Sequence, residues 1–181
     1  MSNKQNLDVK KRIMFSKEDD YYFITYNILV FLDTLGCISE NRRFVDYTKL
    51  TYIIPFISNH LLLDIVVRFN NSNHLPNSEE IELLRETYYS SRLKLKLVTS
   101  ILFALEHNEY IELQKNETRH SIDIWIRKDK IPESFFDTSL YKIEIEHTQK
   151  VREISPRIRT LTVSKLLEQF FGNKGVTVWQ V

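Results

Sequence analysis

Apolar residues recur at three- and four-residue steps along much of the chain, which is the spacing of one buried face of an α-helix. The steps predict six helices, at 20–35, 46–57, 61–69, 78–89, 92–107 and 162–171. Gly36 and Gly172 follow the first and last of them, where glycine commonly ends a helix. Pro55 lies inside the second, so we expect a kink or a new helix there. The run 61–69 is apolar on most sides and rich in β-branched residues, so a strand remains an alternative to a helix there. In the predicted helix 92–107, the apolar stripe begins at Leu93.

Two short stretches alternate apolar and polar residues, as half-buried strands do. They are 110–114 and 121–127, and the polar stretch between them is short enough for a turn. The pattern predicts an antiparallel hairpin. A helix followed directly by a hairpin, after two or three earlier helices, is the order of a winged-helix module. The predicted fold class is therefore mainly α with a small β-hairpin, a winged-helix-like domain with a C-terminal helical or strand extension.

The chain divides into three predicted parts. Residues 1–15 are polar and basic and predict a flexible arm, residues 16–130 form the winged-helix-like domain, and residues 131–181 form the C-terminal extension. Within the extension, 141–154 fits a helix or a strand, and 176–181 resembles a terminal strand. We find no apolar signal segment and no uninterrupted apolar span, so we expect a soluble, cytoplasmic protein.

Composition excludes several classes of site. The net charge of +1 gives no global attraction to nucleic acid, so such binding would need a local patch. Three glycines are too few for a dinucleotide fingerprint or a P-loop. The single cysteine, Cys37, excludes an intramolecular disulfide and a multi-cysteine zinc site, and we interpret it as a small, semi-buried hydrophobic residue.

Candidate catalytic residues are few. The five histidines are far apart, without metal-ligand spacing. Asp123 with Glu144 and Glu146 could supply an acidic nuclease site, but the lysine that such sites usually need is not in register. Arg127 shares a strand face with Asp123, with Glu112 across the ladder, and we interpret these as solvated surface charges. We expect a protein that is not an enzyme and uses no metal or cofactor; a small nuclease is a third alternative.

Aromatic residues often stand in adjacent pairs, and one narrow helix stripe cannot bury both members of a pair. One member of each pair is therefore expected at a partner surface, where aromatic side chains commonly anchor interfaces. The candidate interface residues are Tyr22, Tyr52, Phe56, Tyr89, Phe136 and Trp179.

Basic residues suggest a second kind of surface, because winged helices often place a basic helix in the major groove and the wing near the backbone. The candidate nucleic-acid contacts are Arg92, Lys94, Lys96, Lys115 and Arg119. Neighbouring acids such as Glu106 and Glu109 dilute this patch, so a solvated charged face is the competing interpretation. A winged-helix, DNA-binding transcription regulator is the alternative function.

Four stretches carry a family resemblance: Tyr26–Leu32, Asp46–Phe56, Leu61–Arg68 and Ile101–Leu113. In size and pattern over residues 17–127, the chain resembles the middle components of bacterial three-component ABC (SMC-like) ATPase systems, the group that includes the LmuC subunit of Lamassu defence. The resemblance implies a non-catalytic adaptor that bridges an SMC-like ATPase and an effector, often a nuclease, and restrains the effector. Such complexes guard against phage or plasmid DNA. ATP and magnesium would belong to the ATPase partner.

Overall fold

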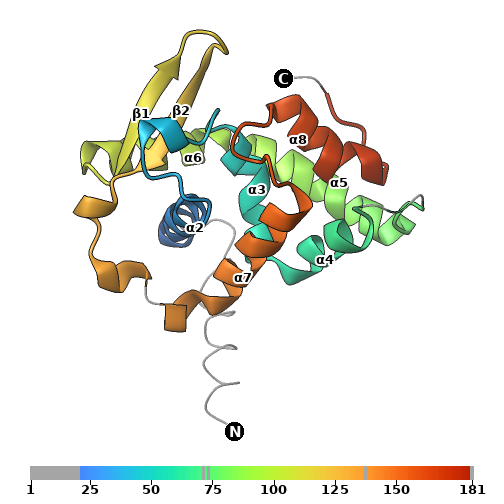
Figure 1. The fold of residues 1–181 in the computed structure, drawn as a ribbon. Coiled ribbons are helices and arrows are strands. Elements are labelled where there is room, and N and C mark those ends of the chain that lie inside the picture. The colour runs from blue at the N-terminus through green and yellow to red at the C-terminus, as the bar shows by residue number, and fades with distance from the viewer. Residues whose placement is uncertain (1–20, 71, 73, 137, 180–181) are drawn as a thin grey trace, which may run out of the picture.

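The computed structural model of the protein describes residues 21–179 except 71, 73 and 137. These residues form a mainly α-helical body with a two-stranded antiparallel hairpin, as the sequence predicts (Figure 1). The helices and strands are α2 (Tyr21–Thr34), α3 (Lys49–Ser58), α4 (His60–Arg68), α5 (Ser78–Leu93), α6 (Leu95–His107), β1 (Ile111–Asn116), β2 (Ser121–Ile126), α7 (Thr138–Ile154) and α8 (Val163–Phe170). The predicted arm, residues 1–15, lies outside the described residues.

Helix α3 is the central element of the fold. It runs through the middle of the body, and α2, α4, α5, α6, α7 and α8 all pack against it (Figure 1). Every residue from Lys49 to Ile57 except Pro55 is buried. A helix that is apolar all round has to be enclosed by other elements, and α3 supplies the framework on which the other helices are placed.

The sharp bend between α3 and α4 does not come at Pro55. Helix α3 continues through Pro55 to Ser58, and the two helices meet at 103° around Asn59, so the expected kink or new helix at Pro55 is wrong. The Asn59 side chain accepts the backbone N–H of Leu61 and thereby caps α4, which is a helix and not a strand. Among the described residues no single helix has the length and hydropathy to cross a membrane, and α3 with α4 meets that test only as a bent pair.

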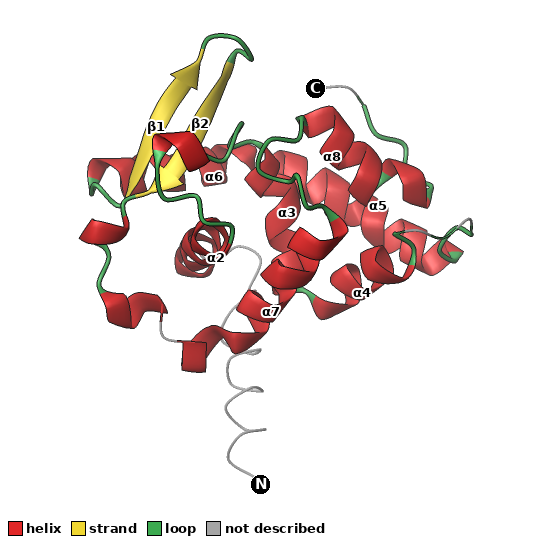
Figure 2. Cartoon of the chain, viewed as in Figure 1, coloured by secondary structure: helices red, strands yellow, loops and turns green. Residues whose placement is uncertain are grey.

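The hairpin stands at one edge of the helical body (Figure 2). Its register places Ile111 opposite Ile126, as expected for an antiparallel pair joined by a short turn. The chain between α2 and α3 pairs with the other edge of β2, where Phe44 and Ile124 exchange both backbone hydrogen bonds. The hairpin is thus attached to the segment that leads into the central helix.

A buried carboxylate strengthens this attachment. Asp123 of β2 is 1% exposed and accepts the backbone N–H of Asp46 at 3.0 Å and the side-chain amide of Asn116 at 2.8 Å. The Arg43 Nε lies 2.9 Å from the Asp123 carboxylate. The expectation of a solvated surface charge is therefore wrong, because the segment before α3 covers Asp123 and satisfies its oxygens.

The C-terminal part shares the core of the preceding helices. Its buried members are Val151, Ile154, Ile158, Leu166, Leu167, Phe170, Phe171 and Val176. Helix α7 settles the choice between helix and strand for 141–154, and α8 begins after Thr162, whose Oγ1 accepts the Lys165 N–H. Residues 176–179 have no sheet partner, so the expected terminal strand is absent from the described part of the tail.

We expect Asp123→Asn to lower the free energy of unfolding by about 2 to 3 kcal/mol, because it leaves the Arg43 charge without its buried partner. Urea unfolding followed by circular dichroism measures the change. Glu112→Gln is the control: the Glu112 carboxylate is half-exposed and pairs with Arg127 at 3.1 Å, so its loss should cost less than about 1 kcal/mol. Equal losses in the two variants would contradict a structural role for Asp123.

Candidate functional site

A cluster of aromatic rings fills the space between α3, α5 and α8. Tyr52 of α3 and Tyr88 of α5 stack with ring centroids 6.0 Å apart, and Phe171 lies 5.5 Å from Tyr88. Phe56 contacts Phe170 at 5.2 Å and Phe171 at 5.4 Å, again between ring centroids. All five side chains are buried. The cluster anchors the C-terminal helix α8 to the central helix.

After α8 the chain turns and runs along α5. Gly175 has φ +87°, in the left-handed region, and a Cβ there would lie 3.3 Å from the Ile81 Cδ1, so glycine serves both the turn and the close approach. Val176 is buried, and the backbone N–H of Trp179 donates to the Tyr88 hydroxyl at 3.1 Å. These contacts hold the tail against α5 up to Trp179.

Trp179 lies on the surface beside the end of α5. Its ring centroid is 5.8 Å from that of Tyr89, and the Arg92 guanidinium carbon lies 5.5 Å from the Trp179 ring centroid. Trp179 is 51% exposed and Tyr89 41%, and Leu93, one helical turn beyond Tyr89, is 84% exposed. We refer to Tyr89, Arg92, Leu93 and Trp179 as the Trp179 platform.

The platform carries positive charge. No carboxylate of a described residue lies within salt-bridge distance of Arg92. The Arg92 guanidinium also lies 6.0 Å from the Tyr88 ring centroid. Burial raises the pKa of the Tyr52 hydroxyl, Tyr88 raises it further, and Arg92 opposes the rise, so the Arg92 charge acts on the ring cluster beneath the surface.

The structure brings together two of the six aromatic residues predicted for an interface. These are Tyr89, near the middle of the sequence, and Trp179, near its C-terminal end. Tyr22 is also on the surface, 81% exposed near the start of α2, where its ring contacts that of Tyr21. These three candidates lie on the surface, but only Tyr89 and Trp179 share one platform, and their role in an interface stays a prediction.

The other aromatic candidates need correction. Tyr52 and Phe56 are 6% and 0% exposed and belong to the buried ring cluster, because neighbouring helices enclose α3 on all sides. Phe136 is half-buried, with its ring 5.2 Å from that of Phe135 and the Lys128 Nζ over it. None of these three side chains offers a fully exposed ring to a partner.

The basic residues predicted for nucleic-acid contact do not form one patch. Arg92 belongs to the platform, and Lys96 is exposed on α6. Lys94 lines a cavity between the helices, and Lys115 and Arg119 line a groove beside the hairpin. Basic residues that are close together in the sequence thus lie on separate surfaces of the folded chain.

The groove beside the hairpin lies between β1 and β2, α6 and the start of α8, and has a volume of about 960 Å³. Phe103 of α6, Leu113 of β1 and Val163 of α8 give it apolar walls, and Phe103 is 53% exposed. Arg119 lies at its edge, where its guanidinium donates to the Thr160 carbonyl at 2.9 Å. The groove is a second surface with accessible apolar side chains, formed by elements that do not contribute to the platform.

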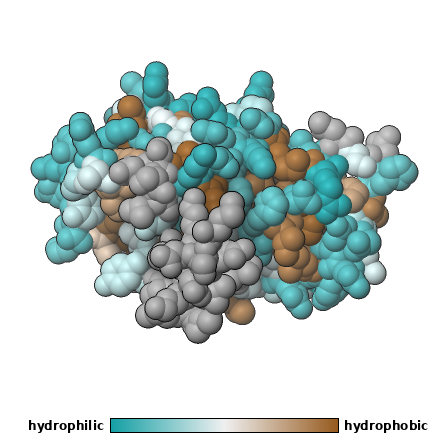
Figure 3. Space-filling model, turned by 90° about the horizontal axis from the view of Figure 1, so that it is seen from below, coloured by the Kyte–Doolittle hydropathy of each residue, from teal (hydrophilic) through white to brown (hydrophobic). Residues whose placement is uncertain are grey.

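Other exposed apolar side chains are scattered. Seen from below, the surface is mostly hydrophilic, with hydrophobic patches that include one toward the side on which α4 lies (Figure 3). Leu61 and Val67 of α4 are 65% and 44% exposed. The arginine next to Val67, Arg68, is already paired with Asp64 and Glu80.

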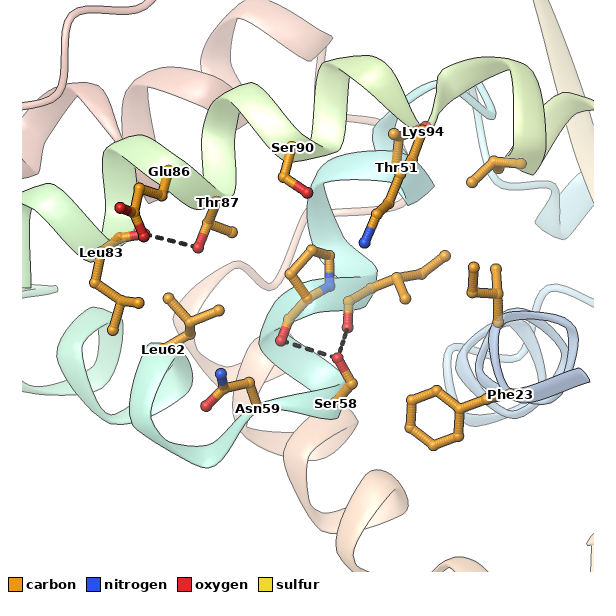
Figure 4. A pocket seen from close by; sticks show the side chains of 14 residues that line it. Phe23, Thr51, Ser58, Asn59, Leu62, Leu83, Glu86, Thr87, Ser90 and Lys94 are labelled. Atoms are coloured by element: carbon orange, nitrogen blue, oxygen red, sulfur yellow. Dashed lines mark hydrogen bonds between the residues drawn. The ribbon is translucent and has the colours of Figure 1, made fainter. Parts of the chain in front are cut away.

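A smaller cavity, of about 240 Å³, lies where α2, α3, α4, α5 and α6 meet (Figure 4). Its apolar walls come from Phe23, Ile24, Ile54, Pro55, Leu62, Leu83 and Val98. Lys94 extends from the end of α5 toward α3 in this view. The Ser58 and Thr87 hydroxyls lining the cavity donate to backbone carbonyls of their own helices. The buried Thr51 Oγ1 has no hydrogen-bond partner among the described residues.

The structure also shows where the metal-ligating and nucleophilic types of side chain lie. The described residues contain no group of three or more His, Cys, Asp and Glu side chains arranged to hold a metal ion. Cys37 is fully buried, and burial raises the pKa of its thiol to about 12, which keeps it protonated. His60 and His147 stack with ring centroids 5.8 Å apart, a proximity that sequence spacing does not reveal.

Lys49 is a fully buried amine at the start of α3. Its Nζ donates to the carbonyls of Ile158 at 2.7 Å and Arg159 at 3.0 Å, and lies 4.2 Å from the Phe44 ring centroid. Burial lowers the Lys49 pKa to about 7, with Asp46 acting in the opposite direction. Because Lys49 is 0% exposed, its role is to join the loop before α8 to the central helix.

Sequence reasoning misplaced Leu93 and missed the contact of the Tyr88 hydroxyl. The pattern puts Leu93 in the buried stripe of a helix over 92–107. In the structure α5 extends to Leu93 and α6 begins only at Leu95, so Leu93 does not share the buried face of α6. The spacing of Tyr89, Arg92 and Leu93 on one helix could have indicated a common exposed face. No local signal predicts that Tyr88 accepts from Trp179, 91 residues away.

Comparison with known proteins adds no assignment, because no family model, curated protein or solved structure matches this chain. The geometry described above and the resemblance of the four sequence stretches are therefore the grounds for a functional proposal.

We expect the buried Lys49 amine to make stability depend on pH. Below pH 7 the amine is charged in both the folded and the unfolded chain, but between about pH 7 and 10.5 only the unfolded chain holds the proton. The free energy of unfolding should therefore rise with pH in this range, by up to about 1.4 kcal/mol per pH unit. Lys49→Met should lose that part of the rise, measured by urea unfolding at pH 7.0, 7.5, 8.0 and 8.5.

This window avoids the opposing effect of Cys37, whose raised pKa lowers stability only above about pH 9. Lys174, with a pKa lowered by burial to about 8, remains in both proteins and cancels in the comparison. Identical pH slopes for the wild type and Lys49→Met would contradict the assignment.

Proposed function

We propose that this chain is a non-catalytic adaptor subunit of a bacterial SMC-like ATPase complex that defends against phage or plasmid DNA in the cytoplasm. In this function it bridges the ATPase and an effector nuclease, restrains the effector, and relays DNA sensing by the ATPase. ATP and magnesium belong to the partner. The family resemblance supports the kind of complex, and the Trp179 platform supports the role within it.

The observation that carries the proposal is the exposed Trp179 platform. Tryptophan, tyrosine and arginine are the residues most enriched among those that dominate binding energy at protein interfaces. Here Trp179 contacts both Tyr89 and Arg92 on the surface, and exposed Leu93 adds apolar area. The hydrogen bond from the backbone N–H of Trp179 to the Tyr88 hydroxyl fixes the backbone that carries the ring before binding, which reduces the entropy lost on association.

A bridging subunit needs two binding surfaces, and the groove beside the hairpin supplies a second. It is built from the hairpin, α6 and the start of α8, whereas the platform uses α5 and the tail. One partner can therefore bind at each surface without competing for the same side chains. This separation supports a bridging role over a simple two-protein contact.

We expect the chain to co-purify with the ATPase and effector encoded beside it when the three are co-expressed. Trp179→Ala should weaken one of these contacts at least tenfold in a titration of the purified subunits, because it removes the central ring of the platform. Tyr110→Ala is the matched control, since Tyr110 is an exposed aromatic residue outside the platform. Unchanged melting temperatures would show that both variants fold.

The adaptor function would be refuted if the wild-type chain bound neither neighbouring subunit and was a stable monomer that turned over a substrate by itself. Equal binding by wild type, Trp179→Ala and Tyr110→Ala would retain an adaptor but remove the platform as its contact surface.

A second candidate function, duplex DNA binding by a winged helix, has one observation in its favour. Helix α6 packs against β1, and the extended segment at Phe44 adds a third strand-like pairing to the hairpin. Lys115 and Arg119 stand at the hairpin end beside α6, where a wing would approach phosphates.

For that candidate, we expect a homodimer whose binding of a fluorescein-labelled duplex weakens steeply with salt. Lys115→Gln with Arg119→Gln should reduce the slope of log affinity against log salt by about 2, since two phosphate contacts are lost. Fluorescence anisotropy measures both quantities. Absence of duplex binding at 50 mM salt would exclude this function.

A further inference from the structure

The Trp179 platform contains an exposed arginine that the described chain leaves without a carboxylate. Two arginines on α4 and α5 are paired with carboxylates: Arg68 with Asp64 and Glu80, and Arg85 with Glu82. Arg92, on the same helix as Arg85, has no such partner among the described residues. Arg92 lies instead beside the rings of Trp179 and Tyr88.

The rings also hold Arg92 in a geometry suited to an anion. Its guanidinium carbon lies 5.5 Å from the Trp179 ring centroid and 6.0 Å from that of Tyr88. No hydrogen bond joins the Arg92 guanidinium to another described residue, so its N–H groups remain able to donate. A planar carboxylate accepts two of these N–H groups in parallel. The platform thus combines available guanidinium donors with the exposed side chains of Leu93 and Trp179.

We infer that the Trp179 platform binds an acidic segment of the partner protein, in which one Asp or Glu side chain pairs with Arg92 and adjacent apolar side chains cover Leu93 and Trp179. This inference rests on the proposed adaptor function and adds the chemistry of the partner surface.

Charge and exposure favour a protein carboxylate over the phosphates of a nucleic acid. The platform contains one basic side chain, Arg92, which matches a single carboxylate, whereas binding to a nucleic acid depends on contacts with several phosphates. Leu93, 84% exposed, gains from burial against an apolar side chain but has no counterpart in a sugar–phosphate backbone.

The experiment uses the co-expressed complex with four versions of this chain. Arg92→Glu reverses the charge and should weaken binding of the platform's partner at least tenfold. Arg92→Lys keeps the charge but loses the paired N–H groups and should weaken it three- to tenfold. Arg152→Glu is the matched control, because Arg152 is an exposed arginine on α7, and its binding should stay within twofold of wild type. Melting temperatures check that every variant folds.

Arg92→Lys also allows the partner residue to be identified. A carbodiimide condenses a lysine amine with a carboxylate in direct contact, so treatment of the Arg92→Lys complex should link position 92 to an Asp or Glu of the partner. Mass spectrometry of the digested product locates the link. The wild-type complex is the control, since arginine does not form this amide.

The outcomes separate the two proposals. If the wild-type complex forms but Arg92→Glu binds as tightly as wild type, the inference is overturned and the adaptor function stands. If the wild-type chain binds neither subunit, the adaptor function fails and the inference fails with it. If the isolated chain binds a fluorescein-labelled 15-nucleotide oligo-dT through Arg92 while the complex is insensitive to Arg92→Glu, the platform is a nucleic-acid site and the inference is overturned.

Discussion

Ring packing between α3, α5 and α8 joins the C-terminal part of the chain to its central helix. Tyr52, Tyr88 and Phe171 meet where these three helices converge, and each ring is buried. Truncating a buried aromatic side chain costs about 3–5 kcal/mol, whereas an exposed ion pair contributes about 0–1 kcal/mol. The ring contacts, more than the many surface ion pairs, therefore decide how firmly α8 and the tail are held.

The same packing places the candidate functional surface. Tyr88 is fixed between Tyr52 and Phe171, and its hydroxyl accepts the backbone N–H of Trp179. The backbone at Trp179 is consequently fixed where its exposed ring lies beside Tyr89 and Arg92. A side chain that is ordered before binding loses less conformational entropy on association, so core packing and partner recognition are connected through one tyrosine.

Two buried polar side chains connect further segments of the chain around the start of α3. Asp123 binds the hairpin to the segment at Arg43 and Asp46, and Lys49 binds the loop at Ile158 to the helix itself. Burying a charge is costly unless its hydrogen-bonding groups are satisfied, so these contacts form only in one arrangement of the hairpin, α3 and the C-terminal loop. They define how the groove beside the hairpin is assembled from distant segments.

Local physics explains which parts of this fold the sequence predicts. The periods of 3.6 and 2 residues, the glycine after α2 and the Thr162 cap of α8 act over a few neighbouring residues, and they locate most helices and the hairpin. The same reasoning predicts that an aromatic pair exposes one member, and it holds for Tyr88 and Tyr89. It does not hold for Phe170 and Phe171, both buried, because the helix ends between them and the second ring is free to turn inward.

By itself, then, the sequence determined the class of fold, the order of its elements and the presence of surplus aromatic residues for a surface. Only the tertiary structure decided that Tyr52 and Phe56 are core, that Asp123 is buried, and that Trp179 meets Arg92. Burial of a side chain depends on segments that approach it from elsewhere in the chain, and periodicity contains no information about which segments those are.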